Sequence, residues 1–272
     1  MTKMMKSRTL INLILLFFNI WLFCVSVGAE EVFRLKLVDR YILDTGSYPE
    51  RMDLSGLTSD GEYLYTVSDL SDQNDIFRIE LHPKPRLIKS MQLDTNWLNK
   101  WYTKNRSSGR FDTEGIAYCN GKFYLAEEST RAVLEIKTHT KIYQPILIEP
   151  NWGSFHSQKY VMNPFSGIKN AGLEAIACHQ DKGSIYIFNE RQFRMGYVLK
   201  LANAELKSQF TIPSGYKYPR KEGRSWVFPD FAGAHFHAEN LYTLVRNRQQ
   251  IVKIDPLTFR VLRRWTYGNM AR

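Results

Sequence analysis

A motif of about 59 residues occurs four times in the chain of 272 residues and restricts the folds that the chain can adopt. Each copy contains three short runs rich in β-branched and aromatic residues, and the first run carries a small residue. These small residues are Gly56, Gly115, Ala175 and Gly233, which are separated by 59, 60 and 58 residues. Turn-forming pairs follow the first run: Asp60-Gly61, Asn120-Gly121, Lys182-Gly183 and Glu239-Asn240. Such runs and turns predict strands joined by hairpins.

A fourth strand in each repeat is predicted at residues 87–93, 142–148, 206–212 and 261–267. Four short antiparallel strands at a fixed period are typical of a β-propeller blade, and the period disfavours a β-sandwich. We therefore predict an all-β protein, a propeller of antiparallel four-stranded blades with the small residues beside its axis. One more outer strand is expected at residues 33–43. Because this makes the strand count uneven, the four recognisable repeats predict five or six blades, or an incomplete ring.

The first 29 residues have the order of a secretory signal peptide. A basic start with Lys3, Lys6 and Arg8 precedes an apolar stretch at residues 10–27, and small residues end at Ala29. This order predicts a signal peptide over residues 1–29 and one propeller domain over residues 30–272. The alternative is an uncleaved anchor, since 18 apolar residues can span a bilayer. In either case we expect a periplasmic or secreted protein, which would contact a membrane only through this segment and only if the segment is uncleaved.

The charge balance indicates the kind of partner. Lys and Arg number 37 against 27 Asp and Glu, a formal net charge of +10. A basic protein favours anionic partners. Export argues against nucleic acid, so we expect an anionic small-molecule ester or a ligand of the cell envelope.

Two cysteines, Cys119 and Cys178, fall at nearly the same place in neighbouring repeats. An exported setting permits a disulfide between them. They could equally be two buried thiols that act as small apolar residues. The sequence leaves both alternatives open.

Acidic residues recur at two positions of the repeat. The residue before the small one is Ser55, Glu114, Glu174 or Ala232, and the residue that ends the second run is Asp69, Glu128, Glu190 or Arg246. Because a hairpin joins the two positions, we expect them at one end of the blade. Five carboxylates would then meet at the mouth of the channel: Asp69, Glu114, Glu128, Glu174 and Glu190.

Such carboxylates have three interpretations. Their oxygens are ligands for calcium or magnesium, which makes these five residues candidate metal ligands. A pair such as Glu114 and Glu174 could instead share a proton and act as a catalytic acid and base. The carboxylates could also be structural, accepting hydrogen bonds from backbone N–H groups that tie the blades together.

The fourth repeat carries a different set of polar residues. His235 and His237 are two positions apart, so a strand would place both on one face. They are candidates for a catalytic or metal-binding pair, or they face solvent. Arg246 replaces an acid and is a candidate ligand for an anionic substrate group, or it neutralises the carboxylates. No motif of a serine nucleophile, a zinc site or a phosphate-binding loop is present, so a Ser/His/Asp mechanism is unsupported.

Three segments together resemble one known family. They are Ser55-Gly56-Leu57, Asp112-x-Glu114-Gly115-Ile116-Ala117 and Asn170-x-Gly172-Leu173-Glu174-Ala175. With them the sequence is similar, over about residues 53–254, to the phytase-like propeller domain, which is also described as having esterase-like activity. The resemblance implies an exported, calcium-dependent propeller that acts on phosphate or other esters, with site roles first on Glu114 and Glu174. The chain departs from the family at Ala232, where an acid is expected, and in its apparent lack of a final blade.

Two functions follow as hypotheses. In the first, the chain hydrolyses an anionic ester, and a metal ion is held at the channel mouth by Glu114, Glu128, Glu174 and Glu190. In the second, it is a non-catalytic propeller of the cell envelope that binds a ligand or a partner protein. Propellers host many unrelated functions, so the fold does not choose between them.

Overall fold

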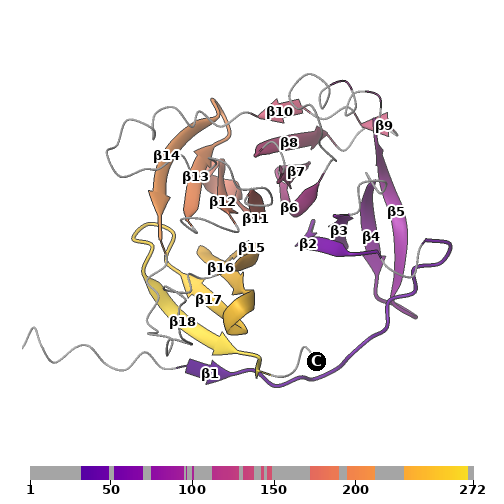
Figure 1. Cartoon of the computed structure of the whole chain (residues 1–272), viewed down its shortest axis with the longest axis horizontal. Coiled ribbons are helices and arrows are strands. Elements are labelled where there is room, and N and C mark those ends of the chain that lie inside the picture. The colour runs from indigo at the N-terminus through magenta and orange to yellow at the C-terminus, as the bar shows by residue number, and fades with distance from the viewer. Residues whose placement is uncertain are drawn as a thin grey trace, which may run out of the picture.

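Four antiparallel sheets, one for each sequence repeat, surround a common centre in the computed structural model (Figure 1). The structure describes residues 32–48, 52–69, 75–94, 96, 100, 112–128, 131–137, 142–143, 146–148, 172–189, 195–211 and 230–268. The predicted signal peptide at residues 1–29 lies outside these ranges. Within them, no helix is both long enough and apolar enough to cross a membrane.

Each sheet is one blade, with its first strand innermost and hydrogen bonds between successive strands. Blade 1 contains β2 (Leu54–Ser59), β3 (Leu64–Ser68), β4 (Asp75–Glu80) and β5 (Arg86–Leu93). Blade 2 contains β6 (Thr113–Cys119), β7 (Lys122–Glu127), β8 (Ala132–Lys137) and β10 (Ile146–Ile148). Blade 3 contains β11 (Leu173–His179), β12 (Ser184–Asn189), β13 (Gly196–Lys200) and β14 (Glu205–Phe210). Blade 4 contains β15 (Phe231–His237), β16 (Asn240–Val245), β17 (Gln250–Ile254) and β18 (Val261–Thr266).

The predicted propeller of antiparallel four-stranded blades is confirmed, but the prediction of five or six blades is not, because the described residues form four. The uneven strand count has a simple origin. β1 (Val32–Arg34) pairs in parallel with β18 and gives blade 4 a fifth strand. The strand predicted at residues 142–148 is divided between two sheets, since β9 (Ile142–Tyr143) pairs in parallel with β5 and β10 pairs with β8.

The small residues bring the inner strands into backbone contact, as predicted. Gly56 has a φ of +68°, and a Cβ there would lie 2.8 Å from the backbone nitrogen of Ile116. A Cβ on Gly115 would lie 3.2 Å from the carbonyl oxygen of Glu174. Side chains at these positions would push neighbouring blades apart.

Three of the four blade junctions are filled by buried apolar side chains. Clusters of this kind join blades 1 and 2, blades 2 and 3, and blades 3 and 4. No cluster of buried apolar side chains in the described ranges joins blade 4 to blade 1. The segment at residues 35–48 instead crosses the outer side of this junction, from β18 to β5 (Figure 1). Its ends are held by hydrogen bonds from Leu35 N to Thr266 O and from Leu87 N to Asp44 O.

A disulfide joins Cys119 at the end of β6 to Cys178 in β11, so the structure selects one of the two alternatives that the sequence left open. The two residues are 59 positions apart and their Cα atoms are 5.8 Å apart. The bond therefore connects the inner strands of blades 2 and 3 at nearly equivalent positions, since Cys119 follows Gly115 by four residues and Cys178 follows Ala175 by three.

Candidate functional site

A β-bulge interrupts the pairing of the inner strand near its start in all four blades. In blade 2, Thr113 lies opposite Glu127 and Gly115 lies opposite Ala126, so Glu114 is the extra residue. Glu174 is the extra residue of blade 3. Gly56 and Ala232 take this place in blades 1 and 4. Bulges redirect side chains and are frequent beside functional sites. Here they remove Glu114 and Glu174 from the regular alternation of the strand.

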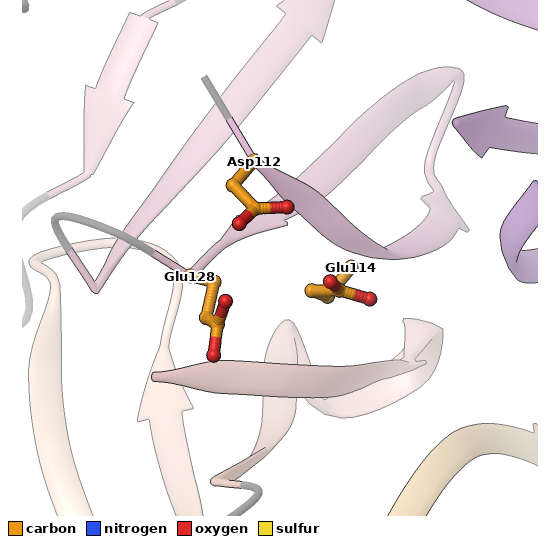
Figure 2. A group of neighbouring side chains, drawn as sticks. All are labelled: Asp112, Glu114 and Glu128. Carbon is orange, nitrogen blue, oxygen red and sulfur yellow. The ribbon is translucent and has the colours of Figure 1, made fainter. Parts of the chain in front are cut away.

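Three carboxylates meet at the bulge of blade 2. Asp112 lies immediately before β6, Glu114 lies on the bulge, and Glu128 follows β7, as Figure 2 shows. One oxygen from each lies within 4.8 Å of the others. A hydrogen bond of 2.8 Å from Glu128 N to Asp112 O closes the hairpin and holds its two ends together. The hairpin therefore brings two residues 16 positions apart in sequence into one group of acids.

Neighbouring blades orient two of these carboxylates. The Ser55 hydroxyl of blade 1 donates a hydrogen bond of 2.7 Å to Oε2 of Glu114. The backbone N–H of Gly172 in blade 3 donates one of 3.4 Å to Oε1 of Glu128. Gly172 also packs directly on Glu128, and a Cβ at this position would lie 2.6 Å from Cγ of Glu128. The group thus depends on three successive blades.

The electrostatics of the group favour a bound cation or proton. Burial, together with the negative charges of Glu114 and Glu128, raises the pKa of Asp112 to about 8. Without a cation, the Asp112 carboxyl therefore holds a proton near neutral pH. A divalent ion would remove the repulsion that produces this shift.

Glu174 forms an ion-pair network with blade 4. Its Oε1 lies 3.2 Å from Nη1 of Arg246. Nε of Arg246 lies 3.1 Å from Oδ2 of Asp230. The Glu174 side chain is only 8% exposed whereas that of Arg246 is 53% exposed, so the guanidinium marks the solvent side of the network. Arg246 neutralises acids here, and its role as a substrate ligand stays a prediction.

The structure therefore brings together only part of the predicted set of metal ligands. Glu114 and Glu128 meet, while Glu174 and Asp69 are not members of the three-carboxylate group found among the described residues. Asp69 donates its backbone N–H to Asp53 O in blade 1, which repeats the hairpin closure seen in blade 2. Glu190 lies outside the described residues.

The predicted histidine pair lies at the other end of the channel. His235 and His237 are stacked on one face of β15 with ring centroids 6.5 Å apart, as their spacing predicts. They come at the end of this strand, whereas the carboxylates lie at the start of theirs. Along the strand the histidines lie three and five residues beyond Ala232, the equivalent of Glu114, which is roughly 10 and 17 Å, and neither belongs to the three-carboxylate group found among the described residues.

Sequence reasoning gave Asp112 no role in the site, although one signal was available. Asp53, Asp112 and Asp230 occupy the same position of blades 1, 2 and 4, and the carbonyl of each accepts the N–H that closes its hairpin. An acid at this position lies beside the end of the second strand.

The family model described as "Phytase-like: Esterase-like activity of phytase" matches residues 52–250. No curated protein matches the chain. Among solved structures, the chain is similar to the glutaminyl cyclase of Myxococcus xanthus, with 11% identity, a TM-score of 0.48, and coverage of 81% of this chain and 73% of that one. It is also similar to Sqt1 of Saccharomyces cerevisiae, with 11% identity, a TM-score of 0.44, and coverage of 78% and 48%. Apo AztD of Citrobacter koseri has 9% identity, a TM-score of 0.36, and coverage of 79% and 47%. Because these TM-scores are below 0.5, no functional argument rests on them.

Proposed function

Because the chain belongs to the phytase-like family, we propose that it is an exported, metal-dependent hydrolase of phosphate or other anionic esters. The observation that carries the proposal is the convergence of Asp112, Glu114 and Glu128 at the start of the inner strands. Export is supported by the N-terminal order of basic, apolar and small residues and by the disulfide, which suits an oxidising compartment.

The donor set fits a hard divalent cation. Calcium and magnesium take carboxylate oxygens, and no softer ligand belongs to this group. Calcium is the proposed ion because it accepts irregular oxygen geometries, whereas magnesium requires a nearly ideal octahedron. An ion held by Asp112, Glu114 and Glu128 would polarise an ester oxygen and lower the pKa of a bound water.

The protein's own residues hold the site ready for this chemistry. Ser55 fixes the direction of the Glu114 carboxylate through its hydroxyl. Gly172 does the same for Glu128 through its backbone N–H. Arg246, half-exposed beside Glu174, places a positive charge where an anionic ester would approach. Ser55 and Gly172 therefore orient the carboxylates that would hold the ion, and Arg246 would attract the anionic substrate.

The test combines calcium binding with turnover. Calorimetry should show calcium binding to the wild-type chain, and its loss in Asp112→Asn and Glu114→Gln. Asp181→Asn is the matched control, since it removes an exposed acid at the opposite end of the inner strands. A panel of phosphate and carboxyl esters should then be hydrolysed only by the variants that bind calcium.

Two results would contradict the proposal. Hydrolysis that persists in Asp112→Asn and Glu114→Gln at the wild-type rate would place the reaction elsewhere. Calcium binding without turnover of any ester would favour the second hypothesis, a non-catalytic propeller of the cell envelope.

A further inference from the structure

A cavity of about 740 Å³ lies at the centre of the ring and extends into the junction between blades 4 and 1. Its size is within the range of small-molecule sites. Apolar side chains from both blades line it: Leu54, Leu57, Leu64 and Ile79 from blade 1, and Leu244 and Ile251 from blade 4. The cavity therefore occupies the junction where a shared cluster of buried residues is missing.

The repeat explains why this lining is apolar. Leu57 follows the small residue of blade 1, as Ile116 and Ile176 do in blades 2 and 3. Ile116 packs against blade 1 and Ile176 against blade 2, and each is 1% exposed. The equivalent Leu57 faces the preceding blade in the ring, which is blade 4, yet it is 51% exposed. Leu57 is thus a core residue of the repeat that the described residues of the neighbouring blade leave half-exposed.

The same argument applies on the opposite wall. Leu244 pairs with Gly233, just as Ala126 pairs with Gly115 and Phe188 with Ala175. Ala126 and Phe188 are fully buried against the following blade. Leu244 is only half-buried and lines the cavity instead. The apolar faces of blade 1 at Leu57 and of blade 4 at Leu244 therefore lie on opposite walls of the cavity, which could hold a chain of methylene groups.

This cavity lies beside the carboxylate site, although Asp112, Glu114 and Glu128 do not themselves line it. Gly56, Gly115 and Glu174 line it, and the first two adjoin Ser55 and Glu114, which hydrogen-bond to each other. A ligand could therefore place a charged head at the carboxylates while its remainder lies between blades 4 and 1.

We infer that the substrate is an amphiphilic phosphate ester, with its anionic head at the carboxylate site and an alkyl or acyl chain in the cavity between blades 4 and 1. This inference rests on the proposed function and adds the substrate class. Binding of the anionic head requires the metal ion, whereas binding of the alkyl or acyl chain requires only the apolar walls of the cavity. The two requirements can therefore be measured independently.

The probes are inorganic phosphate and the n-alkyl phosphates from butyl to octyl, titrated below their micelle concentrations into the calcium-loaded chain. Burial of a methylene group contributes about 0.8 kcal/mol, so affinity should rise about 4-fold for each added methylene until the cavity is filled. A series of n-alkyl alcohols, with and without calcium, measures the contribution of the chain alone.

The variant Leu57→Asn should flatten this dependence on chain length and leave calcium and inorganic phosphate binding unchanged. Leu262→Asn is the matched control, because Leu262 on β18 is 52% exposed and does not line the cavity. This control should keep the full dependence. Equal slopes in the two variants would overturn the inference.

The remaining outcomes separate the inference from the proposed function. If octyl phosphate binds no more tightly than inorganic phosphate, and both require calcium, the inference fails while the proposed function stands. If the alcohols bind as tightly as the phosphates with or without calcium, the phosphate head and the proposed function both fail. A dimer in sedimentation that excludes every alkyl probe would assign the cavity to a second copy of the chain and overturn the inference.

Discussion

The Oγ atom of Ser55 donates a hydrogen bond of 2.7 Å to Oε2 of Glu114 across the boundary between blades 1 and 2. The two residues are one repeat apart and occupy the same position of the motif. The same position of the repeat therefore holds the carboxylate in blade 2 and the hydroxyl that donates to this carboxylate in blade 1. The repeats differ at this position, so the molecule has one asymmetric site and no ring of equivalent acids at Ser55, Glu114, Glu174 and Ala232.

Replacing Ser55 with Ala should weaken calcium binding and leave the fold intact. The variant removes the donor that orients Glu114, and losing such a supporting contact typically lowers metal affinity by about 10- to 100-fold. Calorimetry of calcium binding measures the effect. Ser184→Ala is the control, since its hydroxyl donates to Lys182 O in an exposed turn between β11 and β12. An unchanged affinity in Ser55→Ala would show that the contact has no role in the site.

Gly172→Ala tests the packing between blade 3 and the site. The added Cβ would overlap the carbonyl oxygen of Glu128 and lie 2.6 Å from its Cγ, so the carboxylate must move. We expect a loss of about 1–3 kcal/mol in the free energy of unfolding, together with weaker calcium binding. Gly233→Ala is the matched control, because its Cβ would lie 3.6 Å from Leu244 in ordinary contact. Denaturant titration compares the two variants, and equal stabilities would contradict this account.

The pKa of Asp112 predicts how pH affects the stability of the calcium-free protein. Its folded-state value is about 8, above the usual 3.8, so the folded state retains a proton that the unfolded state releases. The contribution of Asp112 to the free energy of unfolding should therefore be highest below pH 4 and decline as pH rises toward 8. Melting temperatures in chelator measure this decline. The decline in melting temperature should be smaller in Asp112→Asn. Calcium should reverse the decline in the wild-type chain, because it binds the ionised carboxylates. An identical pH profile in Asp112→Asn would show that other groups cause the decline.

The disulfide should contribute strongly to stability. It closes a loop of 59 residues, and the chain-entropy relation for a loop of this length gives about 4 kcal/mol. Reduction should therefore lower the melting temperature of the wild-type chain. A double variant, Cys119→Ala with Cys178→Ala, should melt at a low temperature with or without reductant. A wild-type chain whose melting temperature does not respond to complete reduction would contradict this prediction.

The sequence predicts the fold well because each repeat contains the residue patterns that predict its own strands. The spacing of Gly56, Gly115, Ala175 and Gly233 identifies the inner strands, and the structure places backbone against backbone at Gly56 and Gly115. The alignment also identifies Glu114 and Glu128 as acids at one end of a hairpin, which the structure confirms. Local pattern is sufficient here because hairpins fix the relation between adjacent strands.

Relations between distant parts of the chain could not be predicted in this way. β1 lies beyond β18 as a parallel strand, and the pairing of two chain ends leaves no periodic signal. The open junction between blades 4 and 1 depends on the distance between the first and the last blade of the ring. The spacing of the repeat does not specify this distance. The sequence shows the recurrence of an acid at the position of Asp112, but its approach to Glu114 depends on the bulge at Glu114, which is set by pairing to β7.

If Asp112, Glu114 and Glu128 together hold one divalent ion, calorimetry of calcium binding to matched variants will detect it. The wild-type chain and Asp181→Asn should each bind one calcium ion at this site with equal affinity. Asp112→Asn, Glu114→Gln and Glu128→Gln should each lose that binding while retaining the wild-type circular dichroism spectrum. Calcium binding that persists unchanged in all three folded variants would contradict the account.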